Sequence, residues 1–176
     1  MLTSTNYEDG DNKTIGGMFG IGAKACNIFS TRFIIETIDA KKGLKYNQVF
    51  ENNMSIKNKP KITEVSSHIY PYTKITFYPD LERFNLKKIT KDMYSLMQKR
   101  VYDICGLTDS SIKVYFNDKE IKIKNFNEYA HLYLKGYEKS NIIYEKVNSR
   151  WEVIVTNNSN SSQLEQVSFV NGIWTL

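Results

Sequence analysis

The first half of the chain contains short runs of alternating hydrophobic and polar residues, which are typical of β-strands. Residues 32–39 alternate in this way, and they are followed by a turn at 41–43 and a second run at 45–51. This arrangement predicts a β-hairpin. Residues 61–65 and 72–78 have the same character and predict a second pair of strands.

The same alternation predicts further strands in the second half of the chain. Asn117-Asp118 and Asn148-Ser149 supply turn residues between two of the predicted pairs. The predicted strands are residues 112–116 with 120–123, 142–147 with 150–156, and a last strand at 166–170.

Helical periodicity is clearest at residues 91–104, where Thr90 is a suitable N-cap and Gly106 a suitable C-terminal stop. Shorter helices are predicted at 23–30 and 126–134. The apolar residues of the long helix recur every three or four positions and are expected to pack into a core. They are Met93, Leu96, Met97, Val101 and Ile104.

The mixture of strands and helices predicts an α+β protein. A second alternation of strand and helix begins near residue 118, so we expect a domain boundary there. The two predicted domains comprise residues 1–118 and 119–176.

Composition restricts the classes of protein to which the chain can belong. It is 41% hydrophobic and 24% charged, as expected of a globular protein. No apolar run reaches the roughly 18 residues that a membrane span requires. Cys26 and Cys105 lack paired spacing, so neither a zinc site nor a disulfide framework is indicated and a reducing environment is expected.

The net charge of +5 is compatible with a nucleic-acid partner. However, only four of the 24 basic residues are Arg, and the Lys residues are scattered along the chain. Charge alone therefore leaves two interpretations open, namely a basic nucleic-acid binder and a compositional bias without functional meaning.

A glycine-rich stretch, Gly16 to Lys24, is the strongest candidate for chemistry. Glycines allow the backbone to approach a phosphate closely, and the free N–H groups of a following helix attract anions. The stretch is not a Walker loop, because Ala25 occupies the position of the required hydroxyl residue. It is not a dinucleotide loop either, because no buried strand precedes it. A glycine-rich turn without a ligand remains open on these residues alone.

Other reactive residues form no convincing site. Glu8 and Asp9 lie in a polar stretch and are expected to be solvated. His68 and His131 have no partner at the spacing of a metal site or a catalytic triad. The residues alone therefore indicate no catalytic or metal-binding group.

Several motifs, taken in order, resemble the eukaryotic type II DNA topoisomerases, which belong to the superfamily of gyrase, MutL and histidine-kinase ATPases. The resemblance extends over nearly the whole chain. The motifs are Leu2-Thr3-Ser4-Thr5-Asn6-Tyr7, the glycine-rich stretch through Phe29-Ser30, Thr73 to Phe84, Arg100-x-Tyr102-Asp103, Asn117-x-Lys119, Arg150-Trp151-Glu152-Val153 and Ser168-Phe169-Val170-Asn171.

The resemblance implies a function in binding ATP together with Mg²⁺. It implies that residues 1–118 are the rear part of a truncated two-layer sheet-and-helix ATPase domain, and that residues 119–176 begin an α/β transducer domain. DNA, a homodimeric parent enzyme and a nuclear location are implied as well. The matching residues are Ser4, Thr5 and Asn6 near the ribose and phosphates, and Gly17, Met18, Phe19, Gly20, Ile21, Gly22, Ala23 and Lys24 around the triphosphate.

The sequence also departs from the family. The resemblance places the general-base Glu, the magnesium-binding Asn and the adenine-reading Asp before Met1, and a phosphate-binding Lys after Leu176. Met18-Phe19 replaces the usual Arg-Asn, and Gly172 to Leu176 replaces small and hydroxyl residues. We therefore expect no ATP hydrolysis by the chain alone. A non-catalytic, degenerate nucleotide-binding or protein-interaction module is the alternative.

Overall fold

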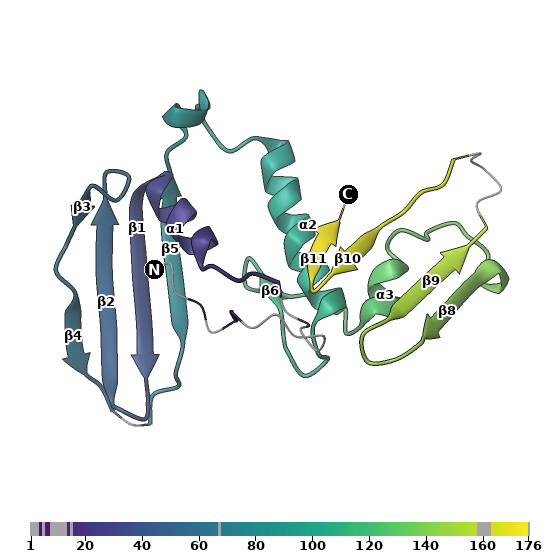
Figure 1. Cartoon of the computed structure of the whole chain (residues 1–176), viewed down its shortest axis with the longest axis horizontal. Helices are drawn as coiled ribbons and strands as arrows, with labels where there is room; N and C mark the ends of the chain where they lie inside the picture. Colours follow the sequence, from purple (N-terminus) through teal and green to yellow (C-terminus); the bar gives the residue numbers. More distant parts are fainter. Residues whose placement is uncertain are drawn as a thin grey trace. The chain divides into compact units, whose positions relative to one another are not determined.

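The computed structural model describes residues 4, 6–7, 14, 16–66, 68–157 and 163–175. The chain forms two compact units (Figure 1). The first comprises Met1–Tyr7 and Gly17–Ile89, and the second comprises Glu8–Gly16 and Thr90–Leu176. None of the helices in the described part of the chain is long and apolar enough to span a bilayer.

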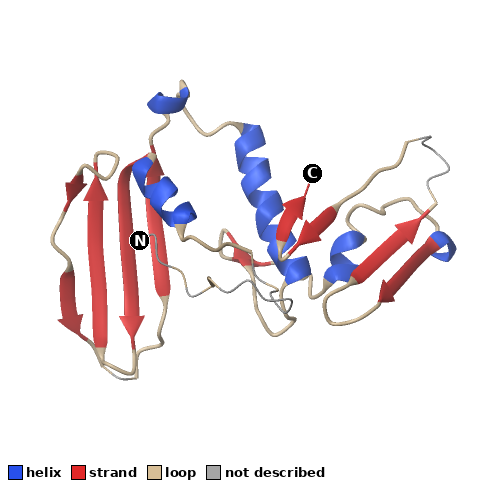
Figure 2. Ribbon diagram, in the orientation of Figure 1, coloured by secondary structure: helices blue, strands red, loops and turns tan. Residues whose placement is uncertain are grey.

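The first unit is built on an antiparallel sheet (Figure 2). The predicted hairpin is confirmed, because β1 (Ser30–Asp39) pairs with β2 (Leu44–Glu51). The order of strands in the sheet is β3-β2-β1-β5, and β4 also pairs with β2. The remaining strands are β3 (Ile56–Lys57), β4 (Lys61–Glu64) and β5 (Thr73–Pro79).

The prediction that residues 61–65 and 72–78 pair with each other is wrong. β4 pairs with β2, where Leu44 lies opposite Glu64, whereas β5 pairs with β1, where Ile35 lies opposite Ile75. The physical reason is that the β1–β2 hairpin has two free edges, each offering unpaired N–H and C=O groups. β4 pairs with the free edge of β2, and β5 pairs with the free edge of β1.

The core of this unit lies where the sheet meets α1 (Ile21–Ile28). Phe33 and Phe50 are buried on adjacent strands, with their rings edge to face at 6.4 Å between centroids. α1 packs on β1 and β5. It begins at Ile21, two residues earlier than the sequence predicted, because Gly20 takes the left-handed conformation that precedes the first turn.

The second unit contains α2 (Lys91–Leu107), α3 (Phe126–Ala130), the short η2 (Lys139–Asn141) and three hairpins. Thr90 caps α2 as predicted, since its Oγ1 accepts a hydrogen bond from the N–H of Met93 at 3.2 Å. The hairpins are β6 (Tyr115–Phe116) with β7 (Lys119–Glu120), β8 (Ile142–Lys146) with β9 (Glu152–Thr156), and β10 (Ser168–Val170) with β11 (Ile173–Thr175).

The structure of this unit differs from the predictions in four details. α2 continues through Gly106, because this glycine is buried against Tyr129 rather than ending the helix. α3 is shorter than predicted, and β11 was not predicted. The apolar stripe is only partly buried, since Leu96 is 60% exposed and Met97 is also exposed.

The compact units divide between Ile89 and Thr90, and the chain also passes from one unit to the other after Tyr7 and after Gly16. α2 contacts α3 and β6, so the elements after residue 90 pack with those after residue 118. The assignment of residues 1–118 and 119–176 to an ATP-binding and a transducer domain stays a prediction. The α+β fold class is confirmed by the sheet and helices described above.

Candidate phosphate-binding site

Two glycines of the loop before α1 have backbone conformations that favour glycine. Gly17 has φ 88° and Gly20 has φ 63°, both in the left-handed region. A residue with a Cβ is strained there, whereas glycine adopts either sign of φ freely. The loop therefore requires glycine at these positions for its shape.

The N-terminus of α1 follows directly and has no side-chain cap. Gly20 occupies the cap position, and the first turn holds no acidic residue. The N–H groups of the first turn have no partner within the helix, and the helix dipole adds a partial positive charge. Ile21, Gly22 and Ala23 are exposed, so an anion can approach these N–H groups.

Lys24 adds a formal positive charge within the same first turn. Its side chain is half-buried, as expected when the aliphatic stem lies along the protein surface. Phe19 is 59% exposed and Met18 is half-buried. Since neither Met18 nor Phe19 carries a polar side-chain donor, the loop can bind an anion only through its backbone and Lys24.

The structure brings the predicted N-terminal segment to the loop. The side-chain Nδ2 of Asn6 donates to the carbonyl of Gly17 at 2.6 Å, and the N–H of Asn6 donates to Ser4 Oγ at 3.0 Å. Thr5, the remaining predicted residue of this segment, lies outside the described residues. Ser4 and Asn6 therefore lie beside the entry to the glycine loop.

The far end of α1 is held by a residue that the sequence analysis did not identify. Asn53, in the turn after β2, donates from Nδ2 to the carbonyl of Ile28 and to Asp80 Oδ2, both at 2.9 Å. Its φ of 55° places the backbone in the left-handed region that asparagine tolerates. Asparagine pairs such as Asn52-Asn53 are typical of turns, but no sequence pattern indicates that Asn53 contacts α1.

No group of three or more His, Cys, Asp or Glu side chains within the described ranges could hold a metal ion. His131 Nδ1 lies at hydrogen-bond distance, 2.7 Å, from the backbone carbonyl of Asn127 on the same helical segment. Glu8 and Asp9 lie outside the described residues. The described part of the site thus offers backbone N–H groups and one lysine to an anion, and its described residues include no carboxylate cluster for a metal ion.

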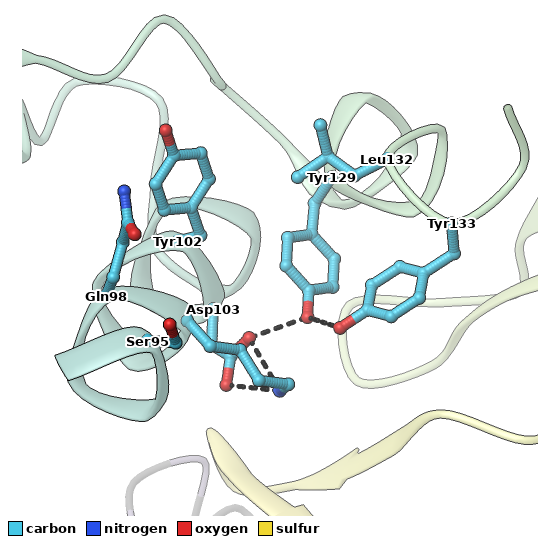
Figure 3. Close-up of a pocket in the computed structure, with 8 residues that line it drawn as sticks. Ser95, Gln98, Tyr102, Asp103, Tyr129, Leu132 and Tyr133 are labelled. Atoms are coloured by element: carbon cyan, nitrogen blue, oxygen red, sulfur yellow. Dashed lines mark hydrogen bonds and ion pairs between the residues drawn. The ribbon is translucent and has the colours of Figure 1, made fainter. Parts of the chain in front are cut away.

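A second polar feature lies in the other unit, around the buried carboxylate of Asp103, which is 2% exposed (Figure 3). Lys99 Nζ lies 2.9 and 3.0 Å from its two oxygens, and the hydroxyl of Tyr129 donates to it at 2.6 Å. The hydroxyl of Tyr133 lies 2.9 Å from that of Tyr129. An open cavity of about 300 Å³ adjoins this network.

Burial is the main reason why the pKa of Tyr129 is raised above its ordinary value of 10.0, and the hydrogen bond to Asp103 raises it further. Ionising this tyrosine would place two negative charges side by side. Because Lys99 and Tyr129 already satisfy the Asp103 carboxylate, we interpret the cluster as structural.

No protein-family model matches the sequence. Curated relatives, however, match the chain along its whole length. DNA topoisomerase 2 of Arabidopsis thaliana is 49% identical over 182 residues, and that of Saccharomyces cerevisiae is 47% identical over 191 residues. The chain belongs to the eukaryotic DNA topoisomerase 2 family. The family resemblance inferred from the ordered motifs is therefore confirmed.

Solved structures of the family identify the region concerned. The ATPase region of Saccharomyces cerevisiae topoisomerase II superposes with a TM-score of 0.87 at 50% identity, covering 99% of this chain and 45% of that one. The ATPase and transducer domains of DNA topoisomerase II from Balamuthia mandrillaris give the same TM-score at 36% identity, covering 99% of this chain and 43% of that one. The chain spans 12% and 13% of the length of the two curated topoisomerases named above.

Proposed function

We propose that this chain supplies the ATP phosphate-binding loop and part of the transducer of a type II DNA topoisomerase. The parent enzyme would use ATP to change DNA topology by passing one duplex through another. The observation that carries the proposal is the uncapped N-terminus of α1 behind two left-handed glycines, in a chain that superposes on a topoisomerase ATPase region.

The described residues would bind the triphosphate chiefly through the backbone. N–H groups of the loop from Gly17 and of the first turn of α1 would donate to phosphate oxygens, and Lys24 would contribute charge. Ser4 and Asn6 lie at the entry to the loop and would face the ribose and phosphates, together with Thr5. Met18 and Phe19 would contribute backbone contacts only.

Magnesium would accompany ATP and neutralise phosphate charge. We propose that its ligand, like the general base of hydrolysis, is supplied by parts of the parent enzyme outside these 176 residues. DNA as a partner, homodimerisation of the parent and a nuclear location belong to the same proposal. These three proposals rest on the sequence and structural similarity to topoisomerases and not on an observed contact.

Binding of a non-hydrolysable ATP analogue tests the proposal directly. We expect the analogue to raise the melting temperature of the chain, and Lys24→Ala to abolish most of the rise. Lys59→Ala is the matched control, because Lys59 is an exposed lysine of the same unit away from the loop. Hydrolysis of ATP by the chain alone is not expected, since no residue of the chain matches the general base of the family.

The alternative is a non-catalytic, degenerate module in which Met18-Phe19 has removed nucleotide binding. It predicts no stabilisation by the analogue at any concentration, and identical behaviour of the Lys24→Ala and Lys59→Ala variants. Such a result would refute the proposed function.

A further inference from the structure

A cavity of about 300 Å³ lies between α2 and α3, wholly within the second unit (Figure 3). This volume is at the lower end of the range for small-molecule sites. The lining residues recur every three or four positions, so one face of α2 forms one wall and α3 with the turn after it forms the other. They are Ser95, Gln98, Lys99, Tyr102 and Asp103 on α2, and Tyr129, Leu132 and Tyr133 on the other wall.

The hydrogen bonds among the buried polar groups of this cavity have only one possible direction. The Asp103 carboxylate, paired with Lys99, can only accept, so the hydroxyl of Tyr129 donates to it at 2.6 Å. A phenol has a single proton, so the 2.9 Å contact between the two tyrosine hydroxyls is a donation from Tyr133 to Tyr129. The proton of Tyr133 is therefore engaged, and its oxygen offers only lone pairs to a ligand.

Three polar side chains of α2 line the cavity without a hydrogen-bond partner in the described part of the chain. Ser95 is exposed, whereas Gln98 and Tyr102 are half-buried. Figure 3 shows Gln98 and Tyr102 on α2, across from Leu132 and Tyr133. Since an amide NH₂ and a hydroxyl can donate, a ligand would meet donors on one wall and an acceptor on the other.

The two charges at the cavity neutralise each other. Asp103 is 2% exposed, and Lys99 Nζ lies 2.9 and 3.0 Å from its two oxygens. The same ammonium lies 4.4 Å from the ring centroid of Trp174, within the range of a cation–π interaction. A charged ligand would therefore lose hydration without meeting an unpaired counter-ion, a cost that a neutral ligand avoids.

The tyrosine rings of the cavity favour a flat ligand. Tyr129 and Tyr133 pack edge to face, with 5.5 Å between ring centroids, and Tyr102 lines the opposite wall. Tyr133 is 44% exposed, so part of its ring remains free to contact another ring. Aromatic side chains bury a large apolar area and prefer edge-to-face or offset-stacked partners.

We propose that this cavity binds a small, uncharged planar ring that carries an amide or lactam group. The C=O of such a group would accept from Gln98 or Tyr102, and its N–H would donate to the oxygen of Tyr133. Its ring would lie against the tyrosine rings. The proposal does not rest on the nucleotide site, because a triphosphate is highly charged and Lys99, the cation that lines this cavity, is already paired.

Benzamide is a suitable probe, because it is a flat, neutral ring with an amide of this kind. We expect saturable binding with a Kd on the order of 1 mM, as is usual for a molecule of this size. An NMR titration measures it through the side-chain amide of Gln98 and the rings of Tyr102 and Tyr133. Benzoate and benzamidinium have the same shape with a negative or a positive charge, and each should bind at least about fivefold more weakly.

Tyr133→Phe tests the acceptor and should weaken benzamide binding about five- to tenfold. Binding of N,N-dimethylbenzamide, which has no N–H to donate, should be unchanged by the same substitution. Tyr144→Phe is the matched control, because Tyr144 is an exposed tyrosine of the same unit outside the cavity. Ser95→Trp places a large side chain at the cavity from an exposed helix position, and it should abolish binding of both amides.

Each contrary result would overturn a defined part of the proposal. Equal affinities for benzamide, benzoate and benzamidinium would contradict selection for a neutral ligand. Shifts that show no saturation up to about 20 mM benzamide, or that persist in Ser95→Trp, would show that the cavity is not a binding site. Unchanged benzamide affinity in Tyr133→Phe, or an equal loss for both amides, would refute the hydrogen bond to the Tyr133 oxygen.

Discussion

At the scale of single residues, the glycines of the loop have different physical roles. Gly20 is required for its backbone, since it caps α1 with φ 63°. Gly16 is required for space, since a Cβ would meet Ile173. Gly22 has neither constraint, because its φ is ordinary and an added Cβ meets nothing within 4 Å. The glycines between Gly16 and Gly22 are therefore expected to respond differently to the same substitution.

Alanine substitutions test this distinction through the free energy of unfolding. Gly20→Ala should lower it by about 1 kcal/mol, because alanine is strained in the left-handed region. Gly22→Ala, the matched control inside the helix, should raise it by about 0.5–1 kcal/mol through better helix propensity. Urea denaturation measures both, and equal destabilisation by the two variants would contradict the assignment.

Tyr129 provides a prediction for the pH dependence of stability. Its pKa is raised by burial and by Asp103, so the folded state keeps the phenolic proton at a pH where the unfolded state loses it. At pH values below the ordinary tyrosine pKa of 10.0, the hydrogen bond from Tyr129 to Asp103 contributes its full stability to the folded protein. As the pH rises above that value, the unfolded state is favoured and stability falls.

Tyr129→Phe removes this proton and its hydrogen bond to a charged group, and should cost roughly 1.5–3 kcal/mol at about pH 8. The difference in stability between the wild type and the variant should narrow towards about pH 11, as measured by urea denaturation at each pH. Tyr70→Phe, at an exposed tyrosine, is the control for removing a hydroxyl and should be close to neutral at about pH 8. A difference that stays constant across this range would contradict the raised pKa.

At the scale of elements, the close packing of α2 on α3 depends on the absence of a side chain at Gly106. A Cβ on Gly106 would lie 2.5 Å from the Cβ of Tyr129. Each Cβ atom is bonded directly to its own backbone, so neither can move away unless α2 or α3 also moves. Helix propensity favours alanine over glycine by about 1 kcal/mol, but the steric overlap at this position is expected to outweigh it.

Gly106→Ala should therefore destabilise the second unit by about 1–3 kcal/mol, despite lying within a helix. The loss should appear as a lower urea midpoint, together with a change in the environment of Tyr129 seen by NMR. Ser95→Ala, at an exposed position of the same helix, should be close to neutral. Stabilisation by Gly106→Ala would show that α3 does not pack as described.

At the scale of the whole molecule, the chain combines two compact units with a net charge of +5. The proposed partner of the parent enzyme is DNA, whose binding to basic proteins releases counterions and weakens with added salt. We expect at most weak binding of duplex DNA by this chain, with an affinity that falls steeply between about 50 and 200 mM salt. Fluorescence anisotropy with a labelled duplex measures this, and binding insensitive to salt would exclude a phosphate-based contact.

The sequence determined the features that depend on neighbouring residues. The β1–β2 hairpin, the Thr90 cap of α2 and the loop before α1 were all predicted, because alternation, capping and glycine content act over a few residues. The order of the motifs also predicted the family, which the relatives confirm. The individual nucleotide contacts remain predictions, since they depend on a ligand.

Tertiary structure decided the features that depend on residues far apart in the chain. β4 and β5 were recognised as strands, but only the two free edges of the β1–β2 hairpin decided their partners. Gly106 had the sequence signature of a helix stop, and only the approach of Tyr129 made it an interior residue. The turn at Asn171-Gly172 was not predicted, and the hydrogen bond from Gly16 to the Asn171 carbonyl joins residues far apart in the chain. Local patterns specify the elements, whereas steric fit and hydrogen bonds between distant residues determine how those elements meet.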